Sequence, residues 1–83
     1  MQLSDASVGT EVLVMAVEPG DAGQGRRLED LGFVVGTRVR VERRAPLGDP
    51  TVYELRGTRI ALRSEGAALV MVDALSAQEG VGG

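Results

Sequence analysis

Short runs of apolar residues, each ended by glycine or proline, predict a mostly β protein. Residues 11–17 are apolar after the first position and rich in valine, which predicts a strand buried on both faces. In residues 38–42, Val39 and Val41 alternate with charged side chains, so this strand has one buried and one solvated face. The two segments therefore belong to a sheet that packs around a core.

Two further segments, residues 51–55 and 58–62, are separated by two residues, the second of which is Gly57. This spacing predicts a β-hairpin in which Gly57 adopts a positive φ. The side chains that we expect to face the core are Tyr53, Leu55, Ile60 and Leu62. A turn at residues 64–66 then leads into a last strand at residues 68–72.

A single helical segment is predicted at residues 26–31, between a glycine-rich loop at residues 19–25 and Gly32. With Gly32 as the left-handed residue after the helix, Phe33 is placed to pack on Leu28, as in a Schellman motif. The glycine-rich loop is a connector, because it completes neither a G-x-G-x-x-G pattern nor a P-loop with its lysine.

Five short strands, tight turns and one helical segment favour a closed barrel, because closure leaves no exposed sheet edges. The predicted fold class is all-β (mainly β): a small SH3-like barrel of five to six short antiparallel strands with one short helix. We expect the domain to span residues 1–73. Residues 74–83 offer little to bury and are expected to form a flexible C-terminal tail.

The residue types that are missing limit the chemistry of this chain. Cysteine, histidine, lysine and tryptophan are all absent from its 83 residues. Without imidazole, thiolate or side-chain amine groups, the common nucleophile–base pairs, Schiff bases and P-loops are excluded, so we expect no enzyme activity and no cofactor. The longest apolar runs hold six residues, against the roughly 20 of a membrane helix, and the first residues lack a signal sequence. This pattern indicates a cytoplasmic protein without direct membrane insertion.

Charge is distributed unevenly along the chain, whose formal net charge is −3. Residues 1–25 carry four acidic residues and no basic one, whereas residues 26–63 hold all nine arginines against five acidic residues, a net charge of +4. Arg26 and Arg27 lie at the start of the predicted helix, where the helix dipole disfavours positive charge. Such a conflict is typical either of a functional surface or of a solvated face on a very short helix.

Three segments of the chain together resemble a known family. They are R-L-E-D-L-G-F at residues 27–33 followed by Gly36, A-P-L-G-D-P at residues 45–50, and A-L-R at residues 61–63. In this order and spacing they are similar to the ferrous-iron transport protein A (FeoA-like) family. The similarity covers residues 3–73, with one departure at Val35, where the family usually has proline.

The resemblance implies an SH3-like barrel that acts as an accessory of ferrous-iron uptake. Its implied partner is the ferrous-iron permease (FeoB-like), a membrane protein with a cytosolic GTP-binding domain, which would recruit the chain to the inner face of the membrane. The same domain type occurs at the C-terminus of metal-responsive repressors, so a regulatory domain of that kind is an alternative. With only two residues before Leu3, a stand-alone protein is favoured.

We expect this partner to be bound by arginines, because their planar guanidinium groups can hold carboxylates through two hydrogen bonds. The candidate contact residues are Arg26, Arg27, Arg38, Arg40, Arg59 and Arg63. Exposed apolar residues leave weak self-association open as well.

Two other kinds of site compete with protein docking. For a metal site, Asp49 and Glu54 are the nearest candidates, but ferrous iron usually takes imidazole or thiolate ligands beside carboxylates, so we expect no metal site. A small barrel with a basic middle segment could also bind nucleic acid. Against that alternative stand the acidic whole chain and its two aromatic residues, Phe33 and Tyr53, both of which are expected in the core.

Overall fold

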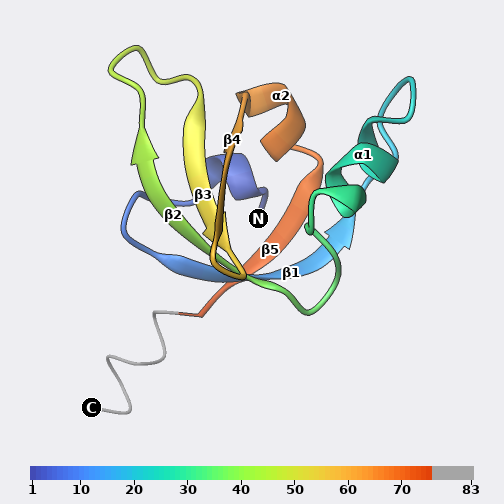
Figure 1. The fold of residues 1–83 in the computed structure, drawn as a ribbon, viewed down its shortest axis with the longest axis horizontal. Helices are drawn as coiled ribbons and strands as arrows, with labels where there is room; N and C mark the ends of the chain where they lie inside the picture. The colour runs from blue at the N-terminus through green and yellow to red at the C-terminus, as the bar shows by residue number, and fades with distance from the viewer. Residues whose placement is uncertain (76–83) are drawn as a thin grey trace.

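The structure, a computed structural model, describes residues 1–75, which form one 3-10 helix, two short α-helices and five strands. In chain order they are η1 (Leu3–Asp5), β1 (Glu11–Val17), α1 (Gln24–Asp30), β2 (Arg38–Arg44), β3 (Thr51–Leu55), β4 (Thr58–Leu62), α2 (Ser64–Ala67) and β5 (Val70–Ala74). Figure 1 shows the strands curving round a common interior, with α2 between β4 and β5 and α1 beside the end of β1.

The strands pair antiparallel in one sheet with the order β4-β3-β2-β1-β5. Beside β5, the first two residues continue the sheet through a bridge between Gln2 and Met71. The Val72 N–H donates to the Met1 carbonyl at 2.8 Å, which fixes this segment. The mainly β architecture predicted from the apolar pattern is confirmed. The expected closure is not: within residues 1–75, β4 and β5 do not pair and are the two ends of the sheet.

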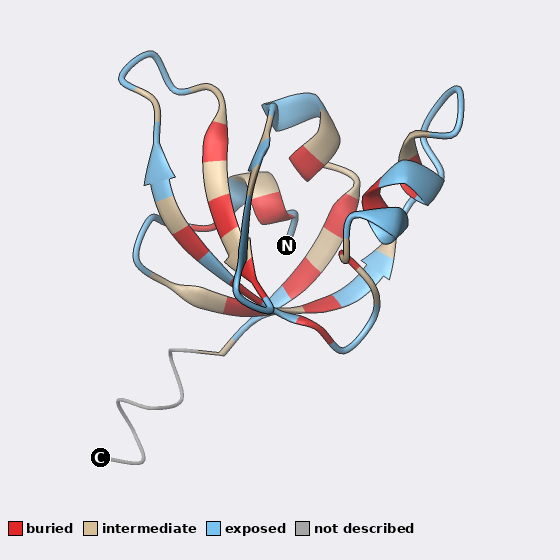
Figure 2. Cartoon of the chain, in the orientation of Figure 1, coloured by how far each residue is buried: buried red, intermediate tan, exposed pale blue. Residues whose placement is uncertain are grey.

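The core lies inside the curved sheet and consists mostly of aliphatic side chains. Figure 2 shows buried and exposed residues alternating along β2. The buried valines of the sheet are Val12, Val14, Val39, Val41, Val70 and Val72. Phe33 and Tyr53 are buried among them and meet edge to face, with 6.3 Å between ring centroids and an interplanar angle of 89°. Aromatic rings prefer this geometry because the positive edge of one meets the negative face of the other.

The prediction that residues 11–17 are buried on both faces is wrong. In β1, Val12 and Val14 are buried, but Met15 and Ala16 are exposed. The pairing of β1 with β5 shifts register between Val14 and Ala16, which breaks the regular alternation of buried and exposed residues. An antiparallel sheet that surrounds its own core leaves its outer face to solvent, so only alternate residues of β1 can be buried.

The segment after β4 also differs from the prediction. Residues 64–66, expected as a simple turn, belong to the short helix α2, so the last strand begins at Val70 and not at residue 68. The reason lies in packing, because α2 places Ala67 in the core with no exposed surface. The strand continues to Ala74, while residues 76–83 of the expected tail lie outside the described residues. The domain boundary at residue 73 stays a prediction.

Two predicted turns are confirmed in detail. After α1, the Phe33 N–H donates to the Leu28 carbonyl at 3.0 Å and the Gly32 N–H to the Glu29 carbonyl at 2.9 Å, with Gly32 at φ 114°. These are the two hydrogen bonds of a Schellman motif. The hairpin turn between β3 and β4 has positive φ at Arg56 as well as at Gly57, as a type I′ turn requires.

Candidate protein-docking surface

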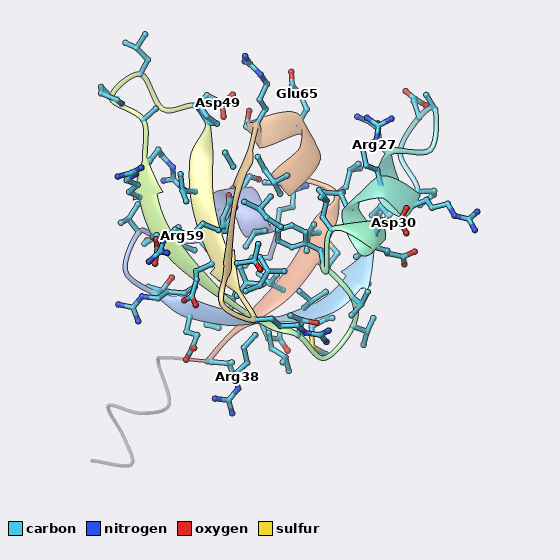
Figure 3. The ribbon with its side chains drawn as sticks, viewed as in Figure 1. Arg27, Asp30, Arg38, Asp49, Arg59 and Glu65 are labelled. Atoms are coloured by element: carbon cyan, nitrogen blue, oxygen red, sulfur yellow. The ribbon has the colours of Figure 1, made fainter. Side chains whose placement is uncertain are left out.

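The structure distributes the six predicted contact arginines over three parts of the surface. Arg26 and Arg27 belong to α1, Arg38 and Arg40 to β2, and Arg59 and Arg63 to β4 and the residue that follows it. All six are exposed. In Figure 3, Arg27, Arg38 and Arg59 project from different sides of the barrel, so the set does not form one continuous face.

Acidic side chains from neighbouring strands accompany the arginines on the outer face of the sheet. In the register of the sheet, the successive cross-strand neighbours are Glu11 of β1, Arg40 of β2, Glu54 of β3 and Arg59 of β4. Directly opposed side chains lie roughly 5 Å apart, so charges of opposite sign adjoin along this row. We call these four residues the charge row. Arg40 and Arg59 therefore have carboxylates of their own sheet as cross-strand neighbours.

Arg59 also makes a direct ion pair. Its Nε lies 2.8 Å from Oε1 of Glu42, across from β4 to β2. This hydrogen bond and the negative charge of Glu42 raise the pKa of the Arg59 guanidinium, which is charged at any physiological pH. Of the candidates on the sheet, Arg38 differs, because its neighbour in β1 is the uncharged Leu13.

Two arginines outside the predicted set stabilise the fold. Arg44 donates from Nε to the Thr51 hydroxyl at 2.8 Å and from Nη2 to the Ala6 carbonyl at 3.1 Å, which ties β2 to β3 and to the end of η1. Arg56 donates from Nη2 to the Thr37 hydroxyl at 3.3 Å. Their roles depend on contacts between distant segments and leave no signal in the local sequence.

A cleft of about 150 Å³ opens between α1 and the end of β4. The side chains and backbone that line it come from Gln24, Arg27, Leu28, Leu31, Leu62 and Gly66. Leu28 is buried, whereas Leu31, three residues further along the chain, is 44% exposed. Arg27 is the charged member of the lining, which contains no carboxylate. The cleft is thus mostly apolar with a basic side chain in its wall, and sequence patterns did not predict it.

A second hollow, of about 300 Å³, lies against the other side of α1 and is lined by Val17, Pro19, Gly25, Arg26 and Glu29. Opposite charges face it from the same helix. It therefore offers no preference for the charge of a ligand.

Of the two candidate metal ligands, Asp49 is engaged in hydrogen bonds of the fold. The Asp49 carboxylate accepts hydrogen bonds from the Ser64 N–H at 2.9 Å and the Ser64 hydroxyl at 3.3 Å, at the start of α2. Glu54 belongs to the charge row. Among residues 1–75, no group of three or more histidine, cysteine, aspartate or glutamate side chains could hold a metal ion. In the same part of the chain, no helix has the length and apolar character to cross a membrane.

Comparison of the sequence with known proteins identifies the family of this chain. Residues 1–74 match the model of the FeoA domain family. The chain belongs to this family. Over 79 residues it is 34% identical to the Fe(2+) transport protein A/Fe(2+) transporter FeoB fusion protein of Porphyromonas gingivalis. The alignment covers 92% of this chain and 9% of the fusion protein, so the chain corresponds to a small part of that relative.

Solved structures confirm the predicted SH3-like fold. FeoA of Stenotrophomonas maltophilia, a prokaryotic SH3 domain protein crystallised with zinc, is 37% identical to this chain, with a TM-score of 0.78. The match covers 88% of this chain and 89% of that one. A manganese-dependent transcriptional repressor matches with a TM-score of 0.80 at 21% identity, over 90% of this chain and 41% of the repressor. At this identity the likeness shows a shared fold alone.

Proposed function

We propose that this chain is a non-catalytic, cytoplasmic accessory of ferrous-iron uptake that binds the cytosolic GTP-binding domain of a ferrous-iron permease. The observation that carries the proposal is the relative in which a FeoA protein and the FeoB transporter are fused in one chain. Domains joined covalently meet at high effective concentration, so a fusion is favourable where the two parts work together. As a separate protein, the same domain would need a binding surface in place of the linker.

Within this proposal, we rank the six candidate arginines by the carboxylates that lie beside each of them. Arg40 and Arg59 adjoin carboxylates of their own sheet, so a partner would have to compete with Glu11, Glu42 and Glu54 for them. Among the described residues, Arg59 alone of the six makes an ion pair, with Glu42, and Arg40 has two carboxylates as cross-strand neighbours, whereas Arg26, Arg27, Arg38 and Arg63 have neither feature. We therefore assign the main electrostatic contacts to these four. An acidic partner surface would gain bidentate hydrogen bonds from them.

A binding measurement tests the proposal directly. The purified chain is titrated by calorimetry with the isolated GTP-binding domain of the permease from the same organism, without nucleotide, with GDP and with a non-hydrolysable GTP analogue. We expect a saturable one-to-one complex in at least one of these states. No detectable binding in all three states would refute the proposed function.

Paired substitutions test the ranking of the arginines. Arg27→Gln with Arg63→Gln should weaken the complex by about tenfold, since it removes two charged hydrogen-bond donors from the contact. The matched control is Arg40→Gln with Arg59→Gln, which removes the same charge from the charge row and should weaken the complex less. Equal effects of the two pairs would contradict the ranking.

Nucleic-acid binding is disfavoured by the positions of the aromatic rings. Phe33 and Tyr53 are 0% and 1% exposed, so neither can stack on a base. The chain has no other aromatic residue. A salt-sensitive mobility shift with RNA or DNA would nevertheless favour that alternative over protein docking.

A further inference from the structure

The two edges of the sheet differ in how they are covered. At the β5 edge, Met1 and Gln2 pair with the strand, and the Met1 amino group donates to the Val72 carbonyl at 3.1 Å. At the other edge, β4 pairs with β3 alone. Within residues 1–75, no segment supplies a second partner for the β4 backbone. An uncovered edge of this kind is a template for pairing with another chain.

The hairpin register identifies which backbone groups of β4 are free. Leu55 and Thr58 flank a two-residue turn and therefore exchange both hydrogen bonds of the ladder. Because hydrogen-bonded and non-hydrogen-bonded pairs alternate, Arg59 and Ala61 direct their N–H and C=O groups away from β3. Both residues are exposed, so these groups are accessible from solvent.

The cleft between α1 and β4 begins where this free edge ends. Leu62, the residue after Ala61, lines it together with Leu28 of α1 and Leu31, which directly follows α1. In an extended peptide, alternate side chains point to the same side, so a strand paired with β4 can place one side chain in the cleft. The volume of about 150 Å³ and the apolar walls suit one aliphatic side chain.

The charge around the cleft restricts the kind of peptide. Arg27 lines the cleft and Arg63 directly follows Leu62, while the lining holds no carboxylate. An acidic side chain beside the apolar one would be attracted to the guanidinium group of Arg27, which lines the cleft, and to that of Arg63, which directly follows Leu62. A basic peptide would meet like charge.

We propose that the β4 edge and the adjoining cleft bind a short extended segment of the permease that contains an aliphatic residue flanked by acidic residues. The segment adds to the sheet as a further strand: its backbone pairs with Arg59 and Ala61, its aliphatic side chain enters the cleft, and its acidic side chains meet Arg27 and Arg63. This inference rests on the proposed function for the identity of the partner. It deepens that function by naming the surface and the sequence character of the ligand.

Substitution at Ala61 tests the backbone pairing. Ala61→Pro removes the outward N–H but no ladder bond to β3, and an edge strand tolerates proline at such a position. We expect it to weaken binding of the permease's GTP-binding domain by about fivefold to tenfold, the effect of one lost hydrogen bond. Ala61→Val retains the N–H and serves as the control, with affinity close to that of the parent protein.

Substitution at Leu31 tests the cleft. Leu31→Asp places a carboxylate in the apolar wall, facing an acidic ligand, and should weaken binding more than tenfold. Leu31 is partly exposed, so the fold should tolerate the change. Leu47→Asp is the matched control, because Leu47 is 97% exposed and lies in the loop between β2 and β3, away from the cleft.

Amide hydrogen exchange tests the inference on the parent protein and its complex, so the result does not depend on whether a variant folds. Binding should slow the exchange of the Arg59 and Ala61 amides, which have no protein acceptor in the free chain. If a complex forms but these amides exchange as before and Leu31→Asp binds normally, the inference is overturned and the proposed function stands. If the parent protein forms no complex in any nucleotide state, both are overturned.

Discussion

Replacement of Gly25 by alanine tests how tightly α1 is held against the barrel. Gly25 is buried at the start of α1, and its N–H donates to the Pro19 carbonyl at 2.8 Å. A Cβ at this position would collide with the Glu18 carbonyl and would lie 2.8 Å from the Pro19 Cα. Both are backbone atoms, so no side-chain rotation can relieve the contact. The helix would have to move away from the end of β1.

Two effects of opposite sign determine the result. Alanine is favoured over glycine inside a helix by up to about 1 kcal/mol. Overpacking that displaces the backbone costs about 1–3 kcal/mol, and a contact with two backbone segments belongs at the upper end of that range. We therefore expect Gly25→Ala to lower the free energy of unfolding by about 1–2 kcal/mol. For a domain of this size, the melting temperature should fall by roughly 5–15 °C.

Gly66→Ala in α2 provides the matched control. A Cβ at Gly66 meets no atom within 4 Å, and the residue has an ordinary helical backbone. The same substitution should therefore leave stability unchanged or raise it by about 0.4–1 kcal/mol. Urea unfolding followed by circular dichroism measures both variants. If Gly25→Ala proves as stable as Gly66→Ala, the packing argument for α1 is refuted.

Three further changes have defined outcomes. Burial raises the pKa of Tyr53 above its ordinary value of about 10, so between the two pKa values the unfolded chain has lost a proton that the folded chain retains. Stability should fall as the pH rises above about 10, and Tyr53→Phe should show a weaker fall in alkaline melting curves; an unchanged pH profile would count against it. Arg44→Ala leaves the Thr51 hydroxyl and the Ala6 carbonyl without their donor. The free energy of unfolding, measured in urea, should fall by about 1–3 kcal/mol. An unchanged value would show that water replaces the guanidinium group. Phe33→Ala opens a cavity in a fully buried site and should lower the free energy of unfolding by about 3–5 kcal/mol. This variant should therefore unfold when it is warmed. A well-dispersed NMR spectrum at raised temperature, which indicates a folded protein, would contradict the assigned core.

Much of the fold follows from local sequence patterns. The alternation around Val39 and Val41 predicted β2, and Gly57 between two β-rich segments predicted the hairpin. Gly32 followed by Phe33 predicted the end of α1 with both of its hydrogen bonds. In each case, the residues that determine the structure lie within a few positions of one another. Local backbone preferences and side-chain alternation therefore determine these elements, and contacts with distant parts of the chain are not needed to predict them.

The candidate site could be predicted only in part. The six arginines were identified from charge alone, but their distribution depends on which strands become neighbours. Glu11 and Arg40 are adjacent because β1 pairs with β2, and Glu54 joins them because β3 pairs on the other side. These contacts connect residues well separated in the chain. A count of charges along the sequence therefore could not show that Arg40 lies between two carboxylates of neighbouring strands.

The sequence by itself determined that this protein is a small, mainly β domain with an aliphatic core, and three of its motifs indicated the FeoA family. Tertiary structure alone decided which charges neutralise each other, that β4 keeps a free edge, and that Leu31 remains partly exposed beside a cleft. The physical reason is the range of the interactions. Turns and side-chain alternation are set by neighbours in sequence, whereas strand order, register and the space between α1 and β4 arise only when the whole chain packs.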